Sequence, residues 1–179
     1  LSARAQQIQV GHGLEQATQM GPLIDERGLE KVERLVADAV SIGAKIHVGG
    51  NRHKAGGTYF QPTVMTNVST NMDLAHEELF GPVAAISTFR DENDAISMAN
   101  DTPYGLAGYF YSRDVGRIFR VADALEVGIV GVNTGLISTE VAPFGGVKES
   151  GIGREGSKYG IEDWTELKYI CLAGLETTA

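Results

Sequence analysis

The feature that most constrains the fold is a regular alternation of apolar runs and helical patterns between residues 81 and 133. Three apolar runs have the composition of strands, and two segments between them have helical spacing. In chain order the five segments are "GPVAAISTF" (81–89), "ENDAISMAN" (92–100), "YGLAGYFYS" (104–112), "RDVGRIFRVADALEVG" (113–128) and "GIVGVN" (128–133). The first run is nearly continuously apolar, as a strand buried on both faces should be. This order predicts an α/β fold with crossover connections and a parallel sheet.

Capping residues define the expected ends of the two helices. Asp91 is placed to cap the helix over 92–100. The helix over 113–128 is expected to stop at Gly128. Its apolar residues recur at helical spacing and are Val115, Ile118, Phe119, Ala122 and Leu125.

The same sequence patterns predict further elements on both sides of residues 81–133. Residues 28–43 are expected to form a helix that has an apolar stripe and stops at Gly43. A short strand at 45–49 and an extended segment at 59–65 are expected to follow. The stripe consists of Leu29, Val32, Leu35, Val36, Ala39 and Val40. After Asn133 a long glycine-rich stretch, 134–156, has no periodicity, and loops of that length in compact domains are usually functional or disordered. A helix over 156–164 and a last strand over 165–174 are expected to follow.

Composition excludes several classes of function. The 179 residues can bury a core without disulfides or a structural metal. A net charge of −8 argues against nucleic acid or an anionic membrane as a partner. With one cysteine, Cys171, and no long apolar stretch, neither an internal disulfide, a signal peptide nor a membrane span is expected, and a reducing, cytoplasmic location is predicted.

The spacing G-x-G-x-x-G occurs once, at Gly151, Gly153 and Gly156. In a dinucleotide-binding fold these glycines follow a buried strand and open a helix, and an acidic residue ends the next strand. Here "PFGGVKES" precedes them, and Glu176, at the right distance for the acid, has no strand after it. The glycines are therefore predicted to form a loop and not a phosphate cradle.

Other candidate groups also favour structural roles. Cys171 lies in an alternating pattern with Leu167 and Tyr169 and has no evident activator, so it is expected to be a buried structural thiol. "HEELF" carries Phe80 where a zinc motif needs a second histidine, and no metal site is predicted. By residue type alone, Glu77 and Glu78 are solvated acids.

Several ordered motifs resemble the C-terminal portion of an aldehyde dehydrogenase. They are "MGPLIDERGLEKVE" (20–33), "HEELFGP" (76–82), "ANDTPYGLAGYFYSRD" (99–114), "GIVGVN" (128–133) and "PFGGVKESGIGREGSKYGIEDWTELKYI" (143–170). "NTGLISTEVAPFGG" and "GREGSKYGIEDWTELKYICL" resemble the succinate-semialdehyde dehydrogenases, which use NAD or NADP in γ-aminobutyrate degradation. The resemblance implies the parallel-sheet catalytic domain of that fold, truncated at its N-terminal side: residues 1–163 are catalytic domain, and 164–179 are an oligomerisation strand and tail.

The resemblance also implies which residues carry out the reaction. In the family a cysteine attacks the aldehyde, hydride passes to the nicotinamide, and a glutamate activates water to release the acid. Both residues lie N-terminal to every motif found here, so no catalytic residue is assigned and the chain alone is expected to be inactive. Cys171 matches a position in the terminal strand, and that strand implies a homodimer or homotetramer.

Four residues are carried over from the family. Glu78 matches the glutamate that binds the nicotinamide ribose hydroxyls, and Phe80 matches the aromatic residue beside the ring. Ser138 matches a serine that binds the substrate carboxylate, and Phe144 an aromatic residue of the substrate tunnel. Two alternatives remain open: a dehydrogenase for glutarate semialdehyde or aliphatic aldehydes, and a non-catalytic assembly module.

Overall fold

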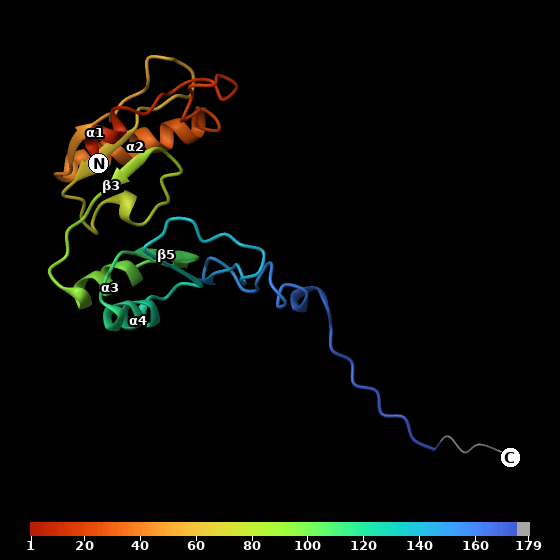
Figure 1. Ribbon diagram of the computed structural model, residues 1–179. Helices are drawn as coiled ribbons and strands as arrows, with labels where there is room; N and C mark the ends of the chain where they lie inside the picture. The colour runs from red at the N-terminus through yellow and green to blue at the C-terminus, as the bar shows by residue number, and fades with distance from the viewer. Residues whose placement is uncertain (175–179) are drawn as a thin grey trace. The chain divides into compact units, whose positions relative to one another are not determined.

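The computed structural model describes residues 1–174 and divides into two compact units, Leu1–Phe89 and Arg90–Ala179 (Figure 1). The first unit contains, in chain order, α1 (Ser2–Ala5), α2 (Glu26–Ile42), β1 (Lys45–Val48), β2 (Thr63–Thr66), the 3-10 helix η1 (Asp73–Ala75) and β3 (Val83–Ala85). The second contains α3 (Glu92–Asn100), β4 (Tyr104–Gly105), β5 (Ala107–Phe110), α4 (Val115–Ala124), β6 (Ile129–Val132), β7 (Val147–Lys148) and the 3-10 helix η2 (Glu162–Trp164). The sequence did not predict a division at residue 89, and the domain boundary at 163 stays a prediction.

Helix α2 organises the core of the first unit. The side chain of Asp25 caps it by accepting a hydrogen bond from the Gly28 N–H at 2.8 Å, and Gly43 ends it in a left-handed conformation with φ of 123°. The predicted stripe is buried except for Val40, which is 44% exposed. The helix packs its stripe against residues from the sheet and loops, namely Ala44, Phe60, Met65, Met72 and Leu74.

The sheet of the first unit has the order β1-β2-β3, with β1 antiparallel and β3 parallel to β2. The expectation that 81–89 is a strand buried on both faces is wrong. Only Val83–Ala85 pair, Ala85 is exposed, and Phe89 is 63% exposed. Among the described residues β3 is an edge strand of its sheet, with β2 on one side only.

In the second unit α4 connects two parallel strands, as predicted. Strand β5 pairs with β6 from Ala107 opposite Ile129 to Phe110 opposite Val132. A separate two-stranded sheet pairs β4 with β7 in antiparallel register. The parallel pairing of β5 with β6 is thus confirmed, but β3 pairs with β2 in another sheet, and the strands of the described chain lie in three short sheets and not in one. Local patterns identify strands, while pairing depends on contacts that are remote in sequence.

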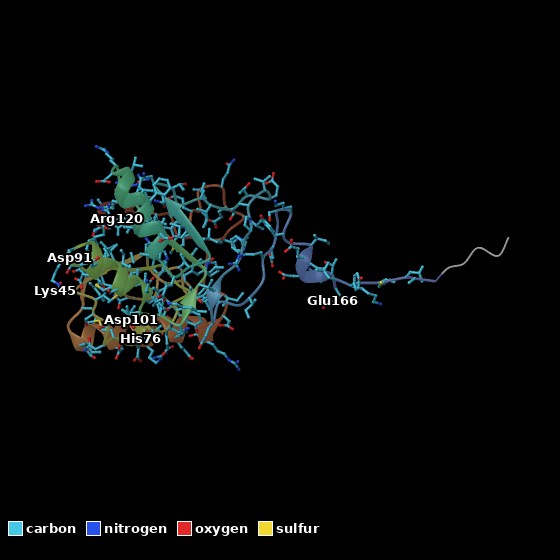
Figure 2. The ribbon with its side chains drawn as sticks, turned by 90° about the horizontal axis from the view of Figure 1, so that it is seen from below. Lys45, His76, Asp91, Asp101, Arg120 and Glu166 are labelled. Atoms are coloured by element: carbon cyan, nitrogen blue, oxygen red, sulfur yellow. The ribbon has the colours of Figure 1, made fainter. Side chains whose placement is uncertain are left out.

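Helices α3 and α4 are capped and linked by charged groups, of which Figure 2 labels Asp91 and Arg120. Asp91 accepts the N–H of Asp94 at 2.9 Å, and Asp114 accepts that of Arg117 at 2.8 Å. From α3 the Glu92 carboxylate bonds Arg117 at 2.8 Å and Arg120 at 3.0 Å on α4. Asp91 therefore caps its helix as predicted, and Glu92 joins the two helices.

The hydrogen bonds of Glu92 predict that the link between α3 and α4 weakens in acid. Hydrogen bonds from Arg120 and then Arg117 hold the pKa of Glu92 below its usual 4.5. Because the folded state depresses this pKa, the stabilisation is complete above pH 4.5 and is lost as the pH falls through the lower, folded-state value. Glu92→Gln should lower the melting temperature slightly at neutral pH and flatten its decline in acid. Glu149→Gln, at an exposed acid of the same unit, is the control, and identical acid profiles for wild type and Glu92→Gln would refute the link.

The helix predicted over 113–128 ends earlier than expected. Leu125 already has an extended conformation, and α4 stops at Ala124. Gly128 has another role, because a Cβ at this position would lie 1.9 Å from the carbonyl oxygen of Gly145. The glycine therefore permits a close approach of two backbone segments and does not stop a helix.

The C-terminal expectations also need correction. Residues 156–164 form turns and η2 instead of a longer helix. The first two, Gly156 and Ser157, have positive φ values of 66° and 52°, which an α-helix excludes. Residues 165–174 run from η2 without pairing (Figure 1). Cys171 is exposed and not buried, since no strand of the described chain covers it. Residues 175–179 lie outside the described residues.

Candidate functional site

Segment 76–82 alternates between anchored and outward-facing residues along the surface of the first unit. Glu77 accepts a hydrogen bond from Arg34 of α2, with Nη2 to Oε2 at 2.7 Å, and Leu79 packs against the core. This hydrogen bond raises the pKa of the Arg34 guanidinium above its usual value. Gly81 fits closely against α2, because a Cβ there would lie 2.6 Å from Cγ2 of Val32. The anchored positions are therefore 77, 79 and 81.

The intervening positions, Glu78 and Phe80, face away from the core. Glu78 is exposed and has no hydrogen-bond partner within residues 1–174, whereas its neighbour Glu77 is held by Arg34. Phe80 is 79% exposed and has a left-handed φ of 44°. A free carboxylate can accept two hydrogen bonds from vicinal hydroxyls, and an exposed ring can pack on a flat heterocycle. Both side chains are exposed, and their contacts with a nicotinamide riboside stay a prediction.

In the second unit, Phe144 lies on a closed, glycine-rich loop. It forms a two-bond bridge with Glu155, at 2.9 and 2.7 Å. Asp163 accepts the Arg154 N–H at 2.7 Å, and the Arg154 guanidinium donates to the carbonyl of Gly146 at 2.8 Å. This loop borders an open hollow of about 400 Å³ that Phe144, Ile152 and Trp164 help to line. Phe144 therefore lies beside an open hollow, and its place in a substrate tunnel stays a prediction.

Ser138 lies in the same long loop but outside that wall. Its side chain is exposed, and its hydroxyl has no partner among the described residues. The structure leaves this hydroxyl accessible without bringing it to Phe144. Its contact with a substrate carboxylate stays a prediction.

The G-x-G-x-x-G spacing forms a loop, as the sequence predicted. Gly151, Gly153 and Gly156 all have positive φ, of 108°, 99° and 66°. The strand before them, β7, has two residues in an antiparallel pair, and no α-helix starts at them. A Cβ on Gly153 would lie 2.6 Å from Oδ2 of Asp163, so glycine lets the loop close on that carboxylate. Glu176 lies outside the described residues.

Two further features concern metals and membranes. Within residues 1–174, no group of three or more His, Cys, Asp and Glu side chains is arranged to hold a metal ion. His76 instead contacts the Thr70 carbonyl, with Nε2 at 2.6 Å. None of the helices in the described part of the chain is both long and apolar enough to span a bilayer.

Comparison with known proteins identifies the family. Residues 1–170 match the aldehyde dehydrogenase family. The chain belongs to that family. It is 55% identical to glutarate-semialdehyde dehydrogenase of Pseudomonas aeruginosa, over 98% of this chain and 36% of that protein. It is 54% identical to succinate-semialdehyde dehydrogenase [NADP(+)] of Escherichia coli K12, over 96% of this chain and 36% of the relative.

Solved structures of aldehyde dehydrogenases have the same fold. Succinate-semialdehyde dehydrogenase of Burkholderia pseudomallei superposes with a TM-score of 0.93 at 54% identity, over 97% of this chain and 36% of that one. Betaine aldehyde dehydrogenase of Staphylococcus aureus, solved with NAD⁺, superposes with a TM-score of 0.86 at 42% identity, over 92% of this chain and 33% of that one. Members of the family thus use NAD or NADP. The chain spans about a third of the length of these relatives.

Some residues around the candidate sites carried no recognisable signal in the sequence. Arg34 is 43 residues from Glu77, and Asp163 is nine from Arg154. An isolated charged residue on a helix is ordinarily solvated, and its partner is not predictable from spacing. Only the tertiary contacts identify these pairs.

Proposed function

We propose that this chain is part of an NAD(P)-dependent aldehyde dehydrogenase that oxidises succinate semialdehyde to succinate. The observation that carries the proposal is the outward placement of Glu78 and Phe80 on a segment whose other residues are anchored. Bound NAD(P)⁺ would supply the hydride acceptor. In this proposal Glu78 accepts hydrogen bonds from the nicotinamide ribose hydroxyls, and the ring of Phe80 packs beside the nicotinamide.

For the substrate, we propose that Phe144 supplies an apolar wall and that Ser138 donates a hydrogen bond to the substrate carboxylate. The cavity beside Phe144 and the free hydroxyl of Ser138 support these roles. A short semialdehyde needs an apolar enclosure with a few polar groups. Glutarate semialdehyde, which is longer by one methylene, is the second candidate substrate, because a relative named for it is 55% identical.

The remaining proposals concern the whole protein. The attacking cysteine and the glutamate that activates water are proposed to lie outside this chain, so the 179 residues alone should have no activity. The unpaired segment 165–174 is proposed to add to a sheet of a neighbouring subunit, giving a homodimer or homotetramer in the cytoplasm.

The kinetic test uses the complete protein and the 179-residue chain side by side. The complete protein should reduce NADP⁺ or NAD⁺ with succinate semialdehyde, and kcat/KM should fall about tenfold with glutarate semialdehyde, since one methylene changes pocket fit by that order. The 179-residue chain should give no turnover. A preference for an uncharged aldehyde would contradict the substrate proposal, and turnover by the chain alone would contradict the placement of the catalytic groups.

A further inference from the structure

We propose that Arg34 is a positioning residue that holds segment 76–82 on α2 and so determines which of two adjacent acids, Glu77 or Glu78, faces the nucleotide. This inference rests on the proposed function of Glu78.

Arg34 holds the residues just before Glu78 through two ion pairs. Its Nη1 lies 3.0 Å from Oδ2 of Asp73 in η1, and its Nη2 lies 2.7 Å from Oε2 of Glu77. One turn along α2, Asp38 Oδ2 accepts the N–H of Asp73 at 3.0 Å. The exposed side of α2 therefore fixes residues 73–77, just before Glu78.

The other end of the segment is held by packing. Leu79 contacts the core, and Gly81 meets Val32 of α2 so closely that a side chain would not fit without a shift. Between these anchors Phe80 has a left-handed backbone, a conformation that non-glycine residues adopt only where the surroundings enforce it. The outward direction of residues 78 and 80 thus depends on anchors on both sides.

Without Arg34, the two carboxylates of Glu77 and Glu78 would be chemically equivalent. Asp73 and Glu77 would then be unpaired acids shortly before Glu78 in a chain of net charge −8, and the segment could present either Glu77 or Glu78. Arg34 neutralises Glu77 and leaves Glu78 as the acceptor. Its side chain is 50% exposed, and such ion pairs contribute little to global stability, so its main effect should be on geometry.

Arg52 provides a matched control. Its guanidinium also bonds two acids, Glu26 at 2.8 Å and Glu33 at 2.8 Å, and it is 46% exposed. Its partners lie on the same helix, α2, but neither belongs to segment 76–82. Arg52→Gln removes an equivalent ion-pair network in the same unit without touching the segment.

The test measures Kd and KM for NADP⁺ and NAD⁺, kcat and the unfolding midpoint in the complete protein. Arg34→Gln should raise the nucleotide Kd and KM about tenfold while kcat changes less, because misplacing a binding group by about 1 Å has effects of this order or larger. Arg34→Lys keeps the charge without the two-pronged geometry and should fall between wild type and Arg34→Gln. Arg52→Gln should leave Kd and KM unchanged. If Arg34 acts through Glu77, Glu77→Gln should weaken binding as well, and the double variant should be no worse than Arg34→Gln.

Three outcomes would overturn the inference. One is wild-type nucleotide affinity in Arg34→Gln while Glu78→Gln loses affinity, which would leave the proposed function standing. Another is an equal loss of affinity and of unfolding midpoint in Arg34→Gln and Arg52→Gln, which would make the role merely structural. If the wild-type protein itself binds neither nucleotide, the proposed function fails and the inference falls with it.

Discussion

Replacing Gly128 by alanine should destabilise the second unit by about 3 kcal/mol, at the upper end of what overpacking costs. The added Cβ would lie 1.9 Å from the carbonyl oxygen of Gly145 and 3.0 Å from Cα of Gly146. The backbone has little freedom to move away, because the Gly128 N–H donates to the carbonyl of Gly105 at 3.0 Å. Relief of the clash must therefore strain the start of β6 or displace the loop that carries Phe144.

Amide hydrogen exchange in β5 and β6 measures this effect within the second unit. Gly135→Ala is the matched control, since no atom lies within 4 Å of a Cβ at that position and its φ is not positive. The control should remain within about 0.5 kcal/mol of wild type. Equal protection of β5 and β6 in Gly128→Ala and Gly135→Ala would contradict the close approach of the two backbones.

Replacing Glu78 by glutamine should weaken binding of NADP⁺ or NAD⁺ by roughly 10- to 100-fold in the complete protein. A hydrogen bond to a charged group contributes about 1.5–3 kcal/mol, and glutamine keeps the shape but loses the charge and one of the two acceptor oxygens. The free carboxylate of Glu78 is the group expected to bind the ribose hydroxyls.

Isothermal titration with each nucleotide, together with KM, tests this expectation. Glu30→Gln is the control, because Glu30 is another exposed acid of the first unit whose carboxylate has no hydrogen-bond partner among the described residues. Its nucleotide affinity should equal that of wild type. An unchanged Kd and KM in Glu78→Gln would remove Glu78 from the proposed cofactor site.

Local features of the chain were predictable from the sequence. The α2 stripe, the Asp91 cap and the Gly43 stop depend on residues within one or two helical turns of each other, so their spacing carries the signal. The loop character of Gly151–Gly156 was predictable for a similar reason: the flanking residues lack the strand and helix that the fingerprint requires.

The errors arose where distant contacts override local patterns. Residues 81–89 look like a central strand, yet β3 is a short edge strand in the described chain. Gly128 looks like a helix stop, yet it is needed because Gly145 comes within contact distance. For Cys171, the alternating pattern predicts burial only if a partner strand covers it, and the described chain contains none.

The sequence by itself determined the three long helices, most strands and the family resemblance that the comparisons confirmed. Those properties follow from hydrophobic periodicity, caps and ordered motifs, which depend on residues that are close together in the sequence. The family resemblance singled out Glu78, but only the tertiary structure showed that Glu77 is held by an arginine while Glu78 has no partner among the described residues. The two acids are adjacent and chemically equivalent in the sequence, and one becomes an ion-pair partner while the other stays free because Arg34, 43 residues before Glu77, reaches just one of them.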